Sequence, residues 1–276
     1  MRFLQRGAPP SQHLSARLVG LLVLTVHLLP HEASAQIINV QSLAGKPVAE
    51  GLSGRIDASG NLRAGNVQLA LGAAELQLFH RTGRNVVMLS ALGSYGLKGT
   101  TEDWAEEPFR ERLFEHLRYR RSLTETWSLE AFVQNEYDRW RRLKLRALVG
   151  AGGRFDKKLG KIGHIAVGLA YMAQWEKLLN ATPVDQQGIY LEHRLSSYVT
   201  GSVKLAERAA VTLTCYLQPN ILDWSDLRGL LESAVLFSLT DRLALKLTGW
   251  WAWDTAPPAT VRGYDINTTI GFSFTI

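Results

Sequence analysis

The sequence contains very little cysteine, and this scarcity excludes several chemistries. Cys215 is the one cysteine among 276 residues, so the chain cannot form a disulfide within itself. A structural zinc site built on several thiolates is excluded for the same reason. The stability of the fold must therefore come from packing, hydrogen bonds and ion pairs.

Long apolar runs and a one-sided charge are also missing. Outside residues 18–29, hydrophobic and polar residues are mixed, and the mean hydropathy is -0.05. Such a composition is too polar for a helical membrane protein and too apolar for a disordered chain. The formal charge of +6 arises from interleaved acidic and basic residues. Because nucleic-acid binders concentrate their basic residues on one face, we expect no nucleic-acid partner.

The amino-terminal segment has the three parts of a secretory signal. Arginines precede the apolar run LVGLLVLTVHLL at 18–29, and Ala33 and Ala35 flank Ser34. A helix that crosses a bilayer needs about twenty residues, so this run is too short to be an anchor. We therefore predict a cleavable signal peptide at residues 1–35, with cleavage after Ala35 and export through the inner membrane.

Beyond residue 50 the hydrophobicity alternates with a period of two residues. Successive side chains of a strand point to opposite sides, so alternation gives one apolar and one polar face. In the last segment the apolar face holds Ile270, Phe272, Phe274 and Ile276, and the small polar face holds Thr269, Gly271, Ser273 and Thr275. An alternating, aromatic-rich final strand is typical of bacterial outer-membrane barrels.

The same pattern predicts twelve strands. They span residues 51–60, 66–80, 84–97, 109–122, 126–138, 143–156, 162–175, 186–203, 208–218, 227–239, 242–254 and 264–276. Tight connections such as TGR at 82–84 alternate with longer ones such as KGTTEDWAEEPF at 98–109, as in bacterial barrels. The sequence therefore predicts an all-β fold, a single transmembrane antiparallel β-barrel over 51–276. Residues 36–50 form a short periplasmic lead-in, and both ends of the mature chain lie in the periplasm.

Two of the predicted strands do not alternate cleanly. In 109–122, Leu113 and Leu117 share a phase with Glu115. Either that face is mixed or a β-bulge shifts the phase. In 186–203, His193 shares a phase with its apolar neighbours.

Charged residues of the other strands are confined to one phase. A lysine on the lipid side at the bilayer midplane costs about 2 to 4 kcal/mol, so this restriction predicts a wet interior. The candidate lumen-lining residues are Glu130, Glu136, Lys144, Arg146, Glu192, Arg194 and Lys246.

A basic run surrounds Trp140 at the predicted outer rim. Guanidinium groups bind phosphate through paired hydrogen bonds, so Arg139, Arg141 and Arg142 are candidate contacts for lipopolysaccharide. The alternative is a solvated turn followed by lumen-facing residues. Outer-membrane lipid and, during insertion, the barrel-assembly machinery are the other expected partners.

The sequence carries no motif that points to catalysis. A triad needs a nucleophile, a base and an orienting group, and no serine-containing elbow accompanies the histidines. The histidines considered are His80, His116, His164 and His193. The acidic group Glu102, Asp103, Glu106 and Glu107 matches no rigid calcium loop. The GAGG run at 150–153 lacks the features of a phosphate-binding loop. We expect no catalytic residue, metal or cofactor.

A stretch in the middle of the chain carries a family resemblance. Residues 116–155 contain Arg118, Tyr119, Trp127, Tyr137, Asp138, Arg146, Gly150 and Gly152, and the end of the chain contains Asp254, Pro257, Pro258 and Asp265. In these features the chain resembles the YdiY-like outer-membrane family, domain of unknown function 481, also called salt-induced outer membrane proteins. Gly60 and Asn61 match the family's Gly-Asn turn, whereas Leu62 and Arg63 depart from its usual Thr-Asp. The resemblance implies an outer-membrane barrel without an established activity.

Two functions stay open at this point, and a third is less favoured. The barrel is either a structural protein of the envelope-stress type or a narrow pore for ions or small solutes. A lipid-acting barrel enzyme is the remaining alternative. A pore predicts a continuous file of charges along the lumen, whereas a structural barrel predicts charges that pair with one another across it.

Overall fold

The structure is a computed structural model that describes residues 48–99, 108–180, 182 and 188–276. The predicted signal peptide with its cleavage site, most of the lead-in and the acidic group at 102–107 lie outside the described residues. Within the described ranges, none of the chain forms a helix of the length and apolarity that a membrane span requires.

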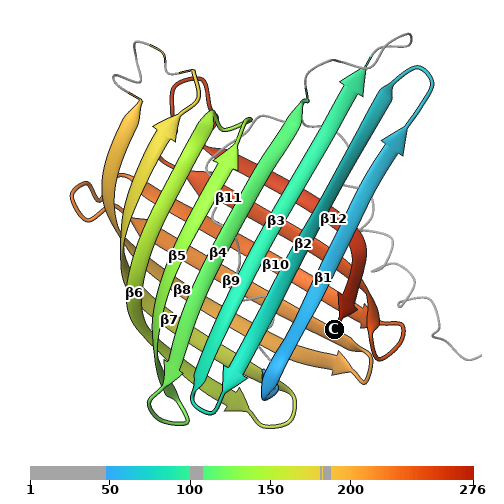
Figure 1. Cartoon of the computed structure of the whole chain (residues 1–276), viewed down its shortest axis with the longest axis vertical. Coiled ribbons are helices and arrows are strands. Elements are labelled where there is room, and N and C mark those ends of the chain that lie inside the picture. The colour runs from blue at the N-terminus through green and yellow to red at the C-terminus, as the bar shows by residue number, and fades with distance from the viewer. Residues whose placement is uncertain (1–47, 100–107, 181, 183–187) are drawn as a thin grey trace, which may run out of the picture. The chain divides into compact units, whose positions relative to one another are not determined.

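The described residues form twelve antiparallel strands that close into one barrel (Figure 1). Each strand pairs with its neighbours in the chain, and the first strand pairs with the last. The strands are β1 (Gly51–Arg63), β2 (Gln68–Thr82), β3 (Asn85–Gly99), β4 (Arg110–Ser122), β5 (Trp127–Asp138), β6 (Leu143–Leu159), β7 (Gly163–Leu178), β8 (Ile189–Ala206), β9 (Ala209–Pro219), β10 (Leu227–Ser238), β11 (Leu243–Asp254) and β12 (Tyr264–Thr275). The predicted fold class is confirmed.

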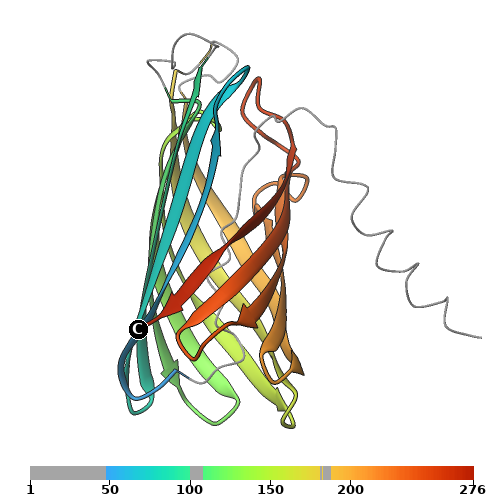
Figure 2. The same cartoon turned by 90° about the vertical axis from the view of Figure 1, so that its right-hand side faces the viewer.

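The connections give the barrel two different ends. At one end, here called the turn end, the hairpins are tight, and Gly83 and Gly160 adopt the left-handed φ values of 57° and 59° that such turns favour. The start of β1 and the end of β12 lie there too (Figures 1 and 2). The other end, here called the loop end, carries the connections at 64–67, 100–109, 139–142, 179–188, 220–226 and 255–263. The predicted alternation of short and long connections holds except at 64–67 and 139–142, which are as short as the longer connections of the turn end.

The outer face of the barrel is an apolar band. Outward side chains such as Val133, Leu169 and Ile270 are about half exposed, because no other part of the described chain covers them. Exposed tryptophan and tyrosine rings lie near both rims, among them Tyr95, Trp127, Trp175, Trp251 and Tyr264. An apolar band between aromatic belts is the surface that a lipid bilayer requires of a barrel.

The two irregular strands have different explanations. In β4 the register with β3 and β5 is continuous, so no bulge shifts the phase. Glu115 lies on the outer face beside Leu117, and the face is mixed. In β8, His193 also lies on the outer face, where its Nδ1 and the hydroxyl of Tyr171 are 2.6 Å apart. Register shifts occur elsewhere, around Lys144 in β6 among other places.

The seam between β1 and β12 is much shorter than the other strand pairs. Four residue pairs are in register, from Arg55–Thr275 to Ala58–Phe272. Two backbone hydrogen bonds between Gly54 and Ile276 extend the pairing at the turn end. By contrast β1 and β2 pair along the whole of β1, from Gly51 to Arg63. Towards the loop end β1 and β12 diverge (Figure 2).

We predict that a charge placed on the outer band destabilises the barrel in a membrane. Leu169 lies on β7 with 57% of its surface exposed, and Leu169→Arg should lower the free energy of unfolding in lipid vesicles by about 2 to 4 kcal/mol. Leu222→Arg is the matched control, because Leu222 is 77% exposed in the connection at 220–226. If Leu169→Arg and Leu222→Arg changed the free energy of unfolding in urea equally, the outer apolar band would not be the lipid-facing surface.

Candidate functional site

Charged side chains gather inside the barrel and pair with one another. Glu136 on β5 is 1% exposed and stands at the centre of the group near the loop end. Arg112 on β4 donates a hydrogen bond of 2.8 Å to Glu136 Oε1, and Arg146 on β6 donates one of 3.2 Å to Oε2. Both carboxylate oxygens of Glu136 are therefore neutralised by guanidinium groups from the two neighbouring strands.

Glu176 continues this network across the lumen. Its Oε1 accepts hydrogen bonds of 2.6 Å from Arg146 and of 2.7 Å from Arg228. Arg146 is on the adjacent strand β6, but Arg228 is on β10, three strands away from β7 around the wall. The Arg228 Nε also donates to Asp254 on β11 at 3.0 Å. The chain of pairs thus joins β5, β6, β7, β10 and β11 from the inside.

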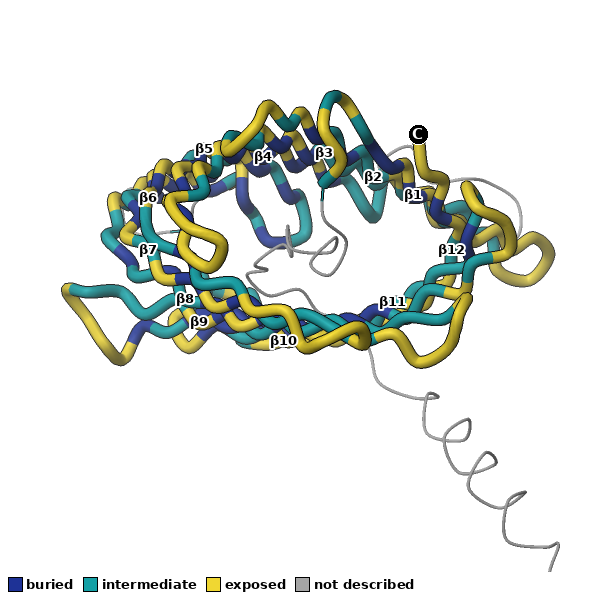
Figure 3. The backbone as a smooth tube through the Cα atoms, turned by 90° about the horizontal axis from the view of Figure 1, so that it is seen from below, coloured by how far each residue is buried: buried dark blue, intermediate teal, exposed yellow. Residues whose placement is uncertain are grey.

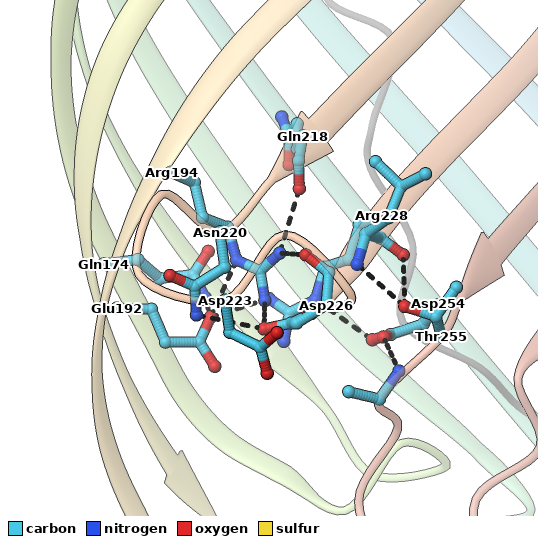
Figure 4. Close-up of polar contacts among 12 residues, drawn as sticks. Gln174, Glu192, Arg194, Gln218, Asn220, Asp223, Asp226, Arg228, Asp254 and Thr255 are labelled. Atoms are coloured by element: carbon cyan, nitrogen blue, oxygen red, sulfur yellow. Dashed lines mark hydrogen bonds and ion pairs between the residues drawn. The ribbon is translucent and has the colours of Figure 1, made fainter.

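Arg194 fastens the connection between β9 and β10 to the wall (Figure 4). This side chain is fully buried and donates to Glu192 at 2.8 Å and to Asp226 Oδ2 at 2.5 Å. It also donates to the carbonyl oxygen of Gln218 at 2.9 Å. Thr255 accepts a hydrogen bond from the Leu227 amide at 2.7 Å, which holds the next connection beside it. We call the whole group the loop-end network: Arg112, Glu136, Asp138, Arg141, Arg146, Glu176, Glu192, Arg194, Asp226, Arg228 and Asp254.

The turn between β5 and β6 folds toward the inside of the barrel. Arg141 is 4% exposed and lies 3.7 Å from carboxylate oxygens of Glu136, Asp138 and, on β12, Asp265. Burial lowers the pKa of Arg141 to about 9, while Asp138 and Glu136 oppose that shift, so it stays charged at neutral pH. Arg142, with φ 54°, donates to the Ala259 carbonyl at 2.5 Å. The turn therefore reaches β12 and the connection that precedes it.

A second group, the turn-end network, surrounds Glu130 on β5. Glu130 Oε2 accepts hydrogen bonds of 3.0 Å from Arg118 and of 2.9 Å from the hydroxyl of Tyr198. Tyr198 is on β8, so this contact also crosses the lumen. Arg154 donates to the Tyr198 hydroxyl at 3.0 Å and to both oxygens of Asp156 at 2.7 Å. In the oval cross-section of Figure 3, β6 and β7 lie at one end of the oval, between the strands β5 and β8 that the contact of Glu130 with Tyr198 joins.

Glycines make room for the rings of the turn-end network. A Cβ at Gly168 would lie 2.2 Å from Tyr198, and one at Gly150 would lie 2.4 Å from Phe132. A Cβ at Gly152 would meet the Leu169 carbonyl at 2.1 Å. Close packing at the barrel wall therefore requires glycine at Gly150 and Gly152.

A third group lies at the opposite end of the oval, beside the short seam. The Lys246 ammonium of β11 donates to Asp57 of β1 and lies 3.8 Å from Glu75 of β2. Arg55 pairs with Asp57 at 3.1 Å. These contacts bypass β12 and tie the first strands to the last ones.

The histidines do not form a catalytic arrangement. His116 is buried, stacks between Phe114 and Phe132, and accepts a hydrogen bond from Arg118 Nε at 3.2 Å. His164 Nε2 lies 2.9 Å from Asp156. His80 pairs with Thr82 on the outer face near the turn end. The four histidines lie on four strands and act as wall residues in these contacts.

Most of the predicted lumen residues take part in the networks. Glu130, Glu136, Arg146, Glu192, Arg194 and Lys246 all pair inside the barrel. Lys144 differs, because it is the extra residue of the β-bulge between Leu143 and Leu145 and is exposed. The family-motif residues Arg118, Asp138, Asp254 and Asp265 also pair inside, whereas Tyr119 and Tyr137 lie on the outer face.

Sequence reasoning missed several central members of the networks. The predicted strand at 162–175 leaves Glu176 in a loop, whereas β7 continues to Leu178. Asp226 lies in a connection, as the sequence predicts, but its contact with Arg194 is not predicted by the pattern. Arg154 has the same parity as Arg146 within one strand, and this signal was available in the sequence. The mixed outer face of β4 hid the inward position of Arg112.

The residues that the structure describes contain no group of three or more histidine, cysteine, aspartate or glutamate side chains arranged to hold a metal ion.

Comparison with models of known protein families gives a match for this chain. Residues 56–276 match the model described as "Protein of unknown function, DUF481". The chain belongs to this family. No curated protein matches its sequence.

Solved structures similar to this DUF481 protein are membrane barrels. The NanC porin aligns over 81% of this chain and 99% of its own, with 9% identity and a TM-score of 0.49. An outer-membrane channel from Pseudomonas putida F1 aligns over 90% of this chain and 99% of its own, with 14% identity and a TM-score of 0.44. An anion-selective porin from Comamonas acidovorans covers 82% and 98%, with 9% identity and a TM-score of 0.39.

We predict that Glu176→Gln strongly destabilises the barrel. The change keeps the shape of the side chain but removes the charge that Arg146 and Arg228 share, and breaking a buried pair costs about 3 to 5 kcal/mol. Urea unfolding of the refolded protein measures the loss. Glu207→Gln is the matched control, since Glu207 is exposed in the turn between β8 and β9. If Glu176→Gln and Glu207→Gln lost the same free energy of unfolding, the loop-end network would contribute nothing to stability.

Proposed function

We propose that this DUF481 protein is a structural barrel of the bacterial outer membrane, of the envelope-stress type, without a reactive centre. One observation carries the proposal: the charged groups of the lumen contact ionic or hydrogen-bonding partners on non-neighbouring strands. Arg228 with Glu176, Tyr198 with Glu130, and Lys246 with Asp57 each join strands that are not neighbours. This is the arrangement expected of a filled, braced interior, because a conducting lumen needs its charges to face water.

The inward turn supports the same proposal at the loop end. Arg141 contacts Asp265 and Arg142 contacts Ala259, so the turn is tied to β12 and to the connection before it. An ion that moves out along the barrel axis would contact the turn that Arg141 and Arg142 hold in place. We propose that the turn closes the axial path and that the wild-type barrel conducts poorly.

The contacts within the turn also reduce the number of arginines that we propose to bind lipopolysaccharide. Arg141 is buried in the loop-end network, and Arg142 donates to carbonyl oxygens of Ala259 and Asn180. Arg139 lies on the outer side, 3.7 Å from Glu111 and with a third of its side chain exposed. We retain Arg139 as the proposed contact for an outer-leaflet phosphate.

The first test concerns sidedness. A reporter tag placed within 256–262 should be reachable from outside intact cells, and a tag within 239–242 should not, because longer loops of bacterial barrels face outward. Surface labelling with an impermeant reagent measures both positions. Labelling of the 239–242 tag alone would invert the proposed orientation.

The second test concerns conduction in planar bilayers. The wild type should give no stable channel, whereas the double change Arg141→Ala with Arg142→Ala should give clear conductance because the turn loses its ties to Asp265, Ala259 and Asn180. Arg139→Ala is the matched control in the same turn and should behave as the wild type. A wild-type conductance equal to that of the double variant would favour the narrow-pore alternative and end the structural proposal.

A further inference from the structure

The seam between β1 and β12 is split over its half nearest the loop end. The register stops at Ala58–Phe272, although β1 continues to Arg63 on its β2 side and β12 starts at Tyr264 on its β11 side. Figure 2 shows the two strands diverging beyond the last pair. Gly271 still lies against Ala58 and Ser59, where an added Cβ would be 2.5 Å from the Ala58 carbonyl oxygen. We call the part beyond it, residues 60–63 and 264–270, the split seam.

Burial changes where the seam splits. In the paired part, the lumen-facing Asp57 and Ser273 are buried. In the split part, Asn61, Arg63 and Asn267 continue the same lumen-facing phase but are exposed. The outward Leu62 and Ile266 are 77% and 64% exposed, so apolar and polar side chains meet along these edges. Unpaired backbone groups in hydrocarbon cost several kcal/mol each, which makes an unoccupied split seam unfavourable in a bilayer.

The lumen wall beside the split seam is apolar, unlike the wall that carries the networks. Leu69 and Leu71 share the lumen phase of β2, opposite Arg63 and Asn61. Phe109 covers the inner side of Gly96, where an added Cβ would lie 2.8 Å from its ring and 3.0 Å from Leu71. Trp140, on the inward turn, packs edge to face on Phe109 with ring centroids 5.9 Å apart. A water-filled lumen does not need this apolar surface.

We propose that the split seam is a lateral portal that binds a single-chain amphiphile with an acidic head group and admits its chain to the lumen. The guanidinium of Arg63 and the amide of Asn61, both on β1, offer donors to an anionic head group. Leu69 and Leu71 contact the apolar chain. The inward turn closes the axial path, so exchange with the lumen at this end runs sideways into the membrane. The inference rests on the membrane position and on the closed axial path that are proposed above, and it goes beyond the structural role.

The geometry favours an amphiphile over an added protein strand. A strand pairs along a straight edge at a constant spacing of about 4.8 Å. The edges of β1 and β12 diverge, so a strand that satisfied one edge would leave the other unpaired (Figure 2). A flexible chain fills a wedge of changing width.

The first experiment measures the split itself. In a Cys215→Ala background, spin labels at Leu62 and Thr268 would be directly opposite if the seam continued in register. Electron paramagnetic resonance in lipid nanodiscs should give a clearly longer distance for this pair than for labels at Ala58 and Phe272, which are in register. Equal short distances for the two pairs would overturn the portal.

The second experiment measures binding with dansyl undecanoate, an anionic amphiphile with a fluorescent tail. The nanodisc-embedded protein should bind it saturably above the partition into empty nanodiscs. Arg63→Gln should weaken binding roughly tenfold, as expected for the loss of one charge-assisted hydrogen bond. Arg84→Gln is the control, because Arg84 is exposed at the turn end. Binding of the uncharged undecanol analogue should not respond to Arg63→Gln.

The outcomes separate this inference from the structural proposal. Binding that does not saturate, or an equal loss in Arg63→Gln and Arg84→Gln, would overturn the portal. Recovery of a second copy or another protein chain on the split seam, detected by native mass spectrometry, would overturn it as well. The heat-dependent gel migration of a folded barrel should stay unchanged in Arg63→Gln, so a failure of the fold is recognised independently.

Discussion

Glu176 accepts hydrogen bonds from two guanidinium groups that approach it from different parts of the wall, and the interior depends on such shared charges. A carboxylate taken from water is tolerated when cations and donors surround it, and removing one partner leaves an uncompensated charge. Glu136 and Glu130 follow the same rule with their own arginines. Cross-lumen pairs limit how far β5, β7, β8 and β10 can move apart, so they hold the oval cross-section as well as stabilising it.

This interior also organises the loop end. Arg194 reaches from β8 into the connection at 220–226, and Arg141 carries the turn at 139–142 inward. In both cases a buried guanidinium holds a backbone segment in place. These two connections are therefore extensions of the charged interior. A change to one network carboxylate is expected to reach a loop that lies several residues away.

The sequence was sufficient to predict the fold because the wall depends on a local signal. Ile270, Phe272 and Phe274 alternate with small polar residues within a single strand, and no long-range information is needed to assign their faces. The strand count and the alternation of the connections follow from the same signal. The alternation signal is weaker at the ends of strands. For this reason the sequence predicts a loop at Glu176, although β7 includes this residue.

The candidate site was predictable only in part. Arg146 and Glu136 were found because charges on one phase of a strand imply a wet side. The partners Glu176 and Arg112 lie beyond that signal, because the sequence predicts a loop at Glu176 and the mixed outer face of β4 hides the inward position of Arg112. The pair of Arg228 with Glu176 crosses the lumen, and such pairs depend on the curvature of the wall and on the tilt of the strands. The inward turn is a similar case: DRWRRL reads as an exposed basic turn, and only the positions of Asp265 and Ala259 explain why it folds inside.

The short seam has a consequence for the biogenesis of the protein. Its two strands stand at opposite ends of the barrel sequence, so their pairing has the greatest loop-closure entropy of any pair in the fold. Closure cannot begin before β12 has been synthesised, and four registered pairs then hold β1 to β12. The hairpins from β2 to β11 are local by comparison. The β1–β12 seam is therefore both the last strand pair to form and the pair with the fewest residues in register. Before it forms, the twelve strands would be an open sheet with β1 and β12 at its edges.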